Sequence, residues 1–237
     1  MAMRPVKTRI LDLVDDGKLG PPPFVGSRFS EEGVFLRERG NTVVSHLVKG
    51  SGSEEALLDI RRQMMTLPYA DHFAFTAASS LHMTVAQGVL ETRRLPGYWP
   101  EGIDLETPVE EITRLYLDRF AGLEDQGPYQ VRVDEVTPYG VTVSGATVED
   151  EETLRRWRDH LCGPFGYRHP DHEAYVFHIT VAYLKKWLPS EAVALYEAEL
   201  ENLLGQLKRT CPVLELDRPA LCSFNDMNHF EPLLYLR

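Results

Sequence analysis

Two histidines and two threonines recur in the same arrangement at two places in the chain. Residues 81–86 read Leu-His-Met-Thr-Val-Ala and residues 177–182 read Phe-His-Ile-Thr-Val-Ala, so His82 and His178 are 96 positions apart. Both segments are rich in apolar and β-branched residues, which predicts β-strands. Side chains alternate between the faces of a strand, so His82 and Thr84 share one face, as do His178 and Thr180. If the two strands face each other, these side chains line a common pocket.

This pattern indicates acid–base catalysis at a phosphate group. An imidazole titrates near pH 6.5, so two histidines can hold complementary protonation states near neutrality. One accepts a proton from attacking water while the other donates a proton to the leaving oxygen, and each such transfer typically contributes about 10²–10⁴-fold in rate. Threonine hydroxyls are neutral donors suited to non-bridging phosphate oxygens. The similarity of the two motifs assigns neither His82 nor His178 to the acid or the base.

The surrounding sequence predicts alternating strands and helices in two related halves. Strands are expected at 42–48, 81–88, 129–136, 141–148, 175–184, 213–216, 220–224 and 232–236, with a strand or turn at 73–76. Helices are expected to begin with Ser53 as a cap, with Thr107 as a cap before Pro108, near Glu149, and at Pro189. Gly163 and Pro164 are expected to end the third helix.

These elements predict an α+β protein with one bilobal domain at residues 41–237. Its halves are approximately 41–125 and 126–237, because each contains one motif and no Pro/Gly/Ser-rich linker separates them. Residues 1–40 are expected to be an N-terminal extension that packs as an arm over the body, since Gly20 and the three prolines that follow it interrupt regular structure.

Composition restricts the classes of binding partner and the cellular location that we expect. A net charge of −11 argues against a protein that grips long nucleic acid through its phosphates. Cys162, Cys211 and Cys222 form no Cys-x-x-Cys pair, which favours a reduced compartment without a disulfide framework or a zinc knuckle. No apolar run has the length of a signal-peptide core or a membrane span, so we expect a cytoplasmic protein without a membrane partner. The sequence carries no signal for oligomeric state.

The paired motifs resemble those of the two-histidine (2H) phosphoesterase superfamily, which includes 2′,3′-cyclic nucleotide phosphodiesterases and bacterial 2′–5′ RNA ligase-like proteins. The family pattern is a histidine, any residue, then a threonine or serine, flanked by apolar residues, and all four positions here match it. The resemblance covers residues 41–237. It implies two pseudo-symmetric lobes, each with an antiparallel-rich sheet and helices on the outside, and motif strands facing a central cleft. The length of the chain and its long loop at 91–105 suggest a divergent subgroup.

The resemblance also implies an activity and roles for individual residues. It implies metal-independent hydrolysis of 2′,3′-cyclic phosphates, or related nucleotide or RNA-end cyclic phosphodiesters, by His82 and His178, with Thr84 and Thr180 binding the phosphate. No cofactor and no metal ligand are expected, and the expected partner is a small nucleotide or an RNA end. An alternative stays open: a non-catalytic nucleotide- or RNA-end-binding module that uses the same cleft.

Several neighbouring residues have two interpretations. Ser80 has the strand parity of His82 and would line the pocket, unless it belongs to the preceding turn. Tyr183 has the opposite parity to His178 and is expected in the core unless the strand bulges. Lys185, Lys186 and Arg168 are either phosphate contacts at the cleft mouth or solvated surface charges, and we expect the latter.

A third functional reading is a metal-dependent hydrolase that uses residues 169–173, which read His-Pro-Asp-His-Glu. His, Asp and Glu are metal ligands in many proteins. The segment nevertheless contains a proline and lacks the His-x-x-x-His spacing of a helical metal site. We therefore expect a solvated loop there.

Overall fold

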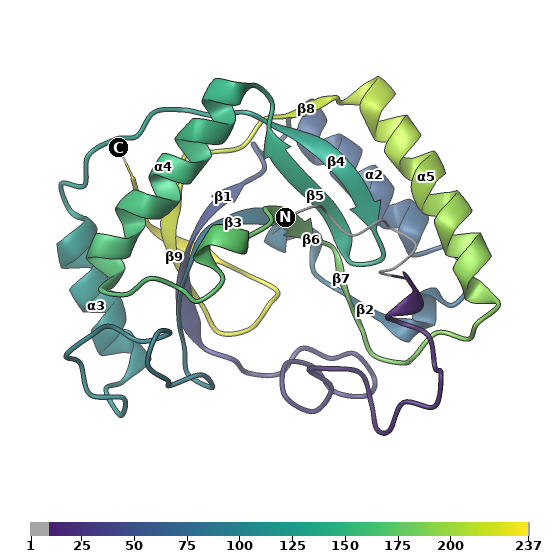
Figure 1. The fold of residues 1–237 in the computed structure, drawn as a ribbon, viewed down its shortest axis with the longest axis horizontal. Helices are drawn as coiled ribbons and strands as arrows, with labels where there is room; N and C mark the ends of the chain where they lie inside the picture. The colour runs from purple at the N-terminus through teal and green to yellow at the C-terminus, as the bar shows by residue number, and fades with distance from the viewer. Residues whose placement is uncertain (1–9, 237) are drawn as a thin grey trace.

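The structure, a computed structural model, describes residues 10–236, and its largest feature is an eight-stranded antiparallel sheet (Figure 1). The strand order is β10-β9-β1-β3-β6-β5-β4-β8. These strands are β1 (Gly40–His46), β3 (His82–Leu90), β4 (Val131–Thr137), β5 (Gly140–Gly145), β6 (His178–Thr180), β8 (Val213–Leu214), β9 (Ala220–Phe224) and β10 (Glu231–Tyr235). A second sheet pairs β2 (Phe73–Phe75) with β7 (Ala182–Leu184).

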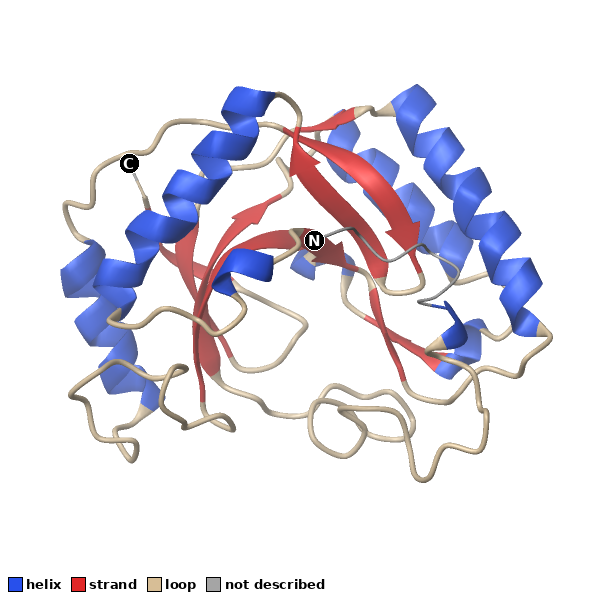
Figure 2. Ribbon diagram, in the orientation of Figure 1, coloured by secondary structure: helices blue, strands red, loops and turns tan. Residues whose placement is uncertain are grey.

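The helices pack in two pairs along the sheet. They are α2 (Gly52–Met64), α3 (Val109–Phe120), α4 (Val148–Phe165) and α5 (Ala192–Thr210). Helices α3 and α4 pack together beside β1 and β3, whereas α2 and α5 pack together, with α5 beside β4. In Figure 2 the strands form an arch, with helices along its outside and loops beneath it. Among helices of residues 10–236, none combines the length and apolar character needed to cross a bilayer.

The C-terminal strands join the sheet beside the first strand. The boundary between the predicted halves, 41–125 and 126–237, falls in the connection between α3 and β4. Strand β9 pairs with β1, and β10 pairs with β9. Both ends of the chain therefore contribute to the same part of the sheet.

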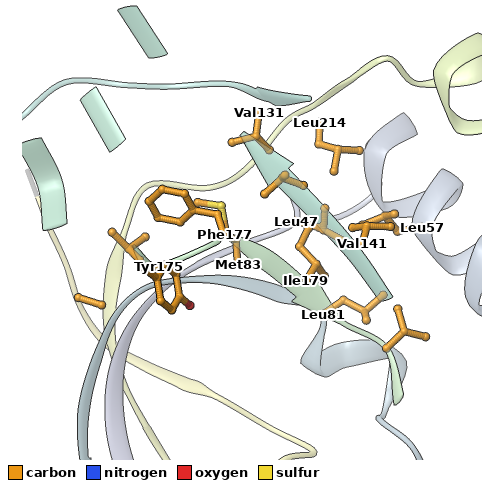
Figure 3. Close-up of a cluster of buried hydrophobic side chains, with 14 of the residues drawn as sticks. Leu47, Leu57, Leu81, Met83, Val131, Val141, Tyr175, Phe177, Ile179 and Leu214 are labelled. Carbon is orange, nitrogen blue, oxygen red and sulfur yellow. The ribbon is translucent and has the colours of Figure 1, made fainter. Parts of the chain in front are cut away.

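The hydrophobic core lies against one face of the two motif strands. Met83 and Ile179 have no exposed surface, and Phe177 is 1% exposed. Figure 3 shows these side chains beside Val131 and Val141 from β4 and β5. The predicted alternation is confirmed on this face, because the apolar residues of each motif are buried on the side opposite to the histidines. This burial fixes the register, since a slip of one residue would move the histidines into the core.

The described part of the N-terminal extension, residues 10–39, packs on the body as expected, and its first nine residues lie outside the described part. Val14 forms a bridge with Leu188, and Phe29 is fully buried. The Phe29 ring lies 5.8 Å from the Tyr183 ring, measured between centroids. The segment therefore has its own anchors and is not a loose tail.

The predicted starts of α2 and α3 differ in detail from the structure, and α5 begins at Ala192 rather than at Pro189. Ser51 caps α2 by accepting a hydrogen bond from the Glu54 amide at 3.2 Å. Ser53 was the wrong cap, because its hydroxyl accepts instead from the Glu215 amide at 2.8 Å. Helix α3 begins one residue later than expected, at Val109, without a side-chain cap from Thr107.

Helix α4 continues through the expected break at Gly163 and Pro164. Pro164 lies in its last turn, and the helix ends at Phe165. Gly166 stops it by adopting a left-handed conformation with a φ of 74°, from which its amide donates to the Cys162 carbonyl. The expected break was wrong because Pro164 comes near enough to the helix end for a single missing amide to be tolerated.

Candidate active site

The two motif strands are neighbours in the large sheet. Strands β3 and β6 run antiparallel, with Met83 opposite Ile179 (Figure 1). Stepping one residue along each strand in opposite directions places His82 opposite Thr180 and Thr84 opposite His178. Directly opposed residues lie about 4.5–5.5 Å apart and diagonal ones about 7–8 Å apart, so all four side chains share one small area of the sheet. The two strands are neighbours within one sheet and do not face each other across a gap. The histidines are therefore brought together on one surface.

A cavity of about 270 Å³ opens on this area. Its lining includes the four motif side chains and residues from several other parts of the chain. Among these parts are the N-terminal segment, β1, the end of β3 with the loop that follows it, and the turn between β9 and β10, which contribute Phe24, Arg28, Thr42, Gln87, Arg93, Met227 and Phe230. The motifs thus form the floor of this cavity.

Both histidines are oriented by the same local hydrogen bond. The Nδ1 atom of His82 lies 2.6 Å from the Ser80 carbonyl, and the Nδ1 atom of His178 lies 2.8 Å from the Val176 carbonyl. A carbonyl only accepts, so each Nδ1 carries the proton of this bond. The Nε2 atom of each ring is then the one available for proton exchange with a ligand. The repeat therefore includes the backbone two residues before each histidine as well as the side chains.

His82 has the more enclosed surroundings of the two. Its ring lies 4.1 Å from the Phe230 ring and 5.9 Å from the His46 ring, between centroids. Loss of hydration lowers the pKa of His82 to about 3, and the hydrogen bond to Ser80 offsets this only in part. His82 is therefore neutral near pH 7. The His178 side chain, in contrast, is exposed.

Tyr175 contacts both motifs, the one on β3 and the one on β6. Its hydroxyl donates to the Thr84 carbonyl at 3.3 Å, and its ring lies 5.8 Å from the His178 ring. The Arg158 guanidinium lies 3.9 Å from the centre of the Tyr175 ring and donates to the Val85 carbonyl at 2.7 Å. Buried hydrogen bonds of this kind fix the spacing of the strands that carry the motif side chains.

Ser80 and Tyr183 both line the cavity. Ser80 belongs to the turn before β3, as one of its two interpretations held, and also reaches the pocket. Tyr183 lines the cavity because the strand is interrupted, which is the exception allowed in the expectation of a core position. The amides of Val181 and Ala182 both donate to the Tyr139 carbonyl, and this irregularity shifts the parity between β6 and β7.

The other candidate cations lie outside the cavity lining. Lys185 donates to the Glu32 carbonyl at 3.1 Å, and Arg168 pairs with Asp159 at 3.1 Å and also with Glu173. Lys186 likewise is not among the lining residues. Within 169–173, His172 contacts Asp159 at 2.9 Å. In the part of the chain that the structure describes, no group of three or more His, Cys, Asp and Glu residues is arranged to hold a metal ion.

Two arginines of the cavity were missed by sequence reasoning. Arg28 comes from the N-terminal segment, and Arg93 follows the end of β3. No side chain among the described lining residues carries a carboxylate. The cavity therefore carries positive charge in a chain whose net charge is −11. The only feature of the sequence that could have indicated this charge was Arg93, an arginine in the loop that follows the first motif.

Two comparisons found proteins similar to this chain. A family model described as 2H-phosphodiest, a domain of unknown function (DUF1868), matches residues 28–142. The crystal structure of the conserved protein of unknown function ATU0111 from Agrobacterium tumefaciens str. C58 has 43% sequence identity and a TM-score of 0.94, over 96% of this chain and 98% of that chain. The chain belongs to the 2H phosphoesterase family. No curated protein matches it.

The fold of this 2H phosphoesterase agrees with the α+β architecture expected for the family. The family model ends at residue 142, after His82 and before His178. The similarity to the Agrobacterium protein extends over nearly the whole chain. Membership of this family supports a phosphodiesterase-type hydrolase in general terms.

A second, more apolar cavity of about 350 Å³ borders the first in this 2H phosphoesterase. His178, Thr180, Phe24 and Tyr183 line both cavities. Most of the remaining lining comes from β5, β7 and the residues beside them, including Val141 and Leu184, with Pro23, Thr137, Val176 and Ile179 completing it. His178 thus stands between a polar space that contains arginines and an apolar space.

Proposed function

We propose that this 2H phosphoesterase hydrolyses 2′,3′-cyclic phosphates, or related nucleotide or RNA-end cyclic phosphodiesters, without a metal ion. The observation that carries the proposal is the antiparallel pairing of β3 with β6, which sets the two histidines diagonally across from each other, each directly opposite a threonine, on the floor of one cavity. In-line displacement at phosphorus needs an acid and a base on either side of the reacting atom. Two imidazoles carried by diagonal positions of paired strands, which lie about 7–8 Å apart, can meet that requirement.

We assign the base to His82 and the acid to His178. Burial keeps His82 neutral near pH 7, and its Nδ1 atom is occupied by the Ser80 carbonyl, so its Nε2 atom can accept a proton from water. The water oxygen forms a new bond to phosphorus while one ring P–O bond breaks. His178 donates a proton to the departing ribose oxygen, and proton exchange with solvent restores both rings.

Thr84 and Thr180 donate hydrogen bonds to the non-bridging phosphate oxygens in this proposal. Donors already in place where charge is held contribute without reorganising during the reaction. The apolar cavity beside His178 provides space for a nucleobase, whose flat surface favours apolar contacts. The proposed partner is therefore a small nucleotide or a short RNA end rather than long nucleic acid. A cytoplasmic location remains a prediction.

A panel of 2′,3′-cyclic nucleotides in excess chelator tests the proposal. The wild type is compared with the His82→Ala, His178→Ala double variant under the same conditions. Turnover by the wild type alone supports the proposed reaction. Turnover that appears only after divalent metal is added contradicts metal independence, and tight binding of cyclic nucleotides without turnover favours the non-catalytic binding module.

A further inference from the structure

Arg28 reaches the cavity from the N-terminal segment and is held there by several contacts. Its Nε donates to a Glu38 carboxylate oxygen at 2.7 Å, and its side chain is 16% exposed. Its guanidinium lies 4.4 Å from the centre of the Phe24 ring and 5.4 Å from that of the Tyr183 ring. Burial lowers the pKa of Arg28, but Tyr183 and Glu38 raise it by more, so its charge is secure. A stacked, ion-paired guanidinium is ordered before a ligand arrives.

Arg93 contributes a second guanidinium from the loop after β3. One terminal nitrogen donates to the Gln87 side-chain oxygen at 3.1 Å, and the guanidinium lies 4.3 Å from the centre of the Tyr98 ring. Its Nε is buried and has no hydrogen-bond partner within the described chain. A buried donor without a partner is unfavourable. Arg93 also lines the cavity, and its guanidinium has further N–H donors for an anionic ligand there.

The two guanidiniums are close enough to interact unfavourably. Burial lowers the pKa of Arg93, and the positive charge of Arg28 adds to the lowering. Among described lining residues of the cavity there is no carboxylate between them, and Glu38 compensates Arg28 from outside the lining. Two like charges in one cavity without an intervening anion repel each other, and a doubly charged phosphate would relieve the repulsion.

The charge of Arg93 lies away from the place where the motifs are expected to hold a phosphate. Its partner Gln87 lies three residues beyond Thr84 on β3, about 10 Å away at about 3.3 Å per residue. Arg93 and the motif side chains nevertheless line the same cavity. The cavity therefore presents two places at which anionic groups of a single molecule can be held.

We propose that Arg28 and Arg93 form a second anion site that binds a second phosphate group of the substrate. The substrate class is then a nucleotide that carries a cyclic phosphate at the ribose 2′ and 3′ oxygens and another phosphate at its 5′ side. This inference rests on the proposed function for the identity of the first phosphate. The second site itself depends only on the two arginines.

Calorimetric binding of two ligands tests the second site without requiring turnover. Adenosine 3′-monophosphate and adenosine 3′,5′-bisphosphate differ only in the second phosphate. In the wild type the bisphosphate is expected to bind at least about tenfold more tightly, because guanidinium–phosphate hydrogen bonds are charge-assisted. In Arg28→Gln and in Arg93→Gln this ratio is expected to fall at least threefold, toward one.

Matched variants separate this effect from general ones. Arg62→Gln removes the same charge from an exposed position on α2, 66% exposed and paired with Asp59, and is expected to keep the wild-type ratio. Arg28→Lys keeps the charge and removes the planar fork, and is expected to give an intermediate ratio. If Arg28→Gln unfolds, Arg93→Gln still tests the site, because it lies outside the N-terminal segment.

The outcomes distinguish this proposal from the proposed reaction. A wild-type ratio near one, or an equal ratio in Arg93→Gln and Arg62→Gln, overturns the second anion site. A retained preference for the bisphosphate that the arginine variants lose supports the site even if no cyclic phosphate is hydrolysed. Hydrolysis of 2′,3′-cyclic nucleotides with a binding ratio near one supports the reaction and rejects the second site.

Discussion

His82 lies directly across the β3–β6 pair from Thr180, so each histidine has the threonine of the other motif as its cross-strand neighbour. Neither half of the chain therefore contains a complete site. The pair that would act on one phosphate oxygen and one proton is assembled only when the two motifs, whose histidines are 96 positions apart in sequence, come together.

Replacing either His82 or His178 by alanine is expected to lower kcat on a 2′,3′-cyclic nucleotide by about 10²–10⁴-fold, because one proton transfer is lost. Neither residue belongs to the hydrophobic core, so far-ultraviolet circular dichroism is expected to remain unchanged. Steady-state kinetics in chelator gives the measurement. Normal turnover in either variant would remove that histidine from the mechanism.

The pH profile tests the assignment of the base. Protonation of His82 would remove the acceptor, and burial lowers its pKa to about 3, so the acidic limb of kcat/KM is expected below pH 6.5. Phe230→Ala, which hydrates the His82 ring, is expected to move this limb toward 6.5. Rates measured from about pH 4 to pH 9 decide the question. An acidic limb at 6.5 in the wild type, unmoved in the variant, would contradict the role of His82.

Stability is expected to fall with acid because of the same histidine. The pKa of His82 is lowered in the folded state, so the unfolded chain binds more protons between about pH 6.5 and pH 3 and the free energy of unfolding decreases as the pH is lowered through that window. Between pH 6.5 and pH 5 the loss from His82 is at most about 2 kcal/mol. Urea unfolding of the wild type and His82→Gln at pH 7 and pH 5 measures it.

In that experiment the wild type is expected to lose more stability than His82→Gln. His229 is 63% exposed beside Glu231, so His229→Gln serves as a surface control and is expected to follow the wild type. Equal losses in the wild type and His82→Gln would show that the burial of His82 has no bearing on acid stability.

The threonines are tested by substitution with valine, which keeps the shape of the side chain and removes the hydroxyl. Thr84→Val and Thr180→Val are each expected to lower kcat/KM by about tenfold to a hundredfold, because a hydrogen bond to a charged oxygen is worth about 1.5–3 kcal/mol. Thr210→Val, at the end of α5, is the matched control and is expected to leave kinetics unchanged. Unchanged kinetics in both motif variants would reject the phosphate-binding role.

Gly140 supports the strand that carries His178. It pairs with Thr180 at a φ of 141°, and a Cβ atom there would lie 2.1 Å from the Ile179 carbonyl oxygen. Gly140→Ala is therefore expected to destabilise the protein by about 2–4 kcal/mol and to reduce turnover. Gly163→Ala, in a helix with nothing within 4 Å of the added atom, is expected to be neutral or stabilising by up to about 1 kcal/mol. Thermal unfolding of both variants gives the comparison, and similar melting temperatures would contradict it.

The floor of the site was predictable because it depends on local patterns. Alternating apolar and polar residues around His82 and His178 determine which side of each strand is buried, and this holds in any sheet that covers one face. The two motifs were also predictable as partners, since they repeat each other. The edge-to-edge pairing of β3 with β6 was not, because strand order depends on contacts between distant parts of the chain.

The residues that form the walls of the site could not be predicted from the sequence, for the same physical reason. Arg28 and Arg93 reach the cavity through the path of loops, which no periodicity encodes. Tyr183 changed sides because of a single irregularity at Val181, and such a break leaves no clear mark in a β-branched run. Ser51 and Ser53 are equally good caps by residue type, and only the distant Glu215 amide decided between them.

The segment that carries Phe24 and Arg28 precedes the first strand of the sheet, yet it forms one side of the cavity. Under the proposed function, Arg28 would recognise the ligand from one stretch of the chain while the paired histidines and threonines react from two others. A change in the stretch ahead of Gly40 is therefore expected to alter which molecules bind while the paired histidines and threonines stay intact. Chains that share this sheet but differ ahead of Gly40 are therefore expected to prefer different phosphate esters.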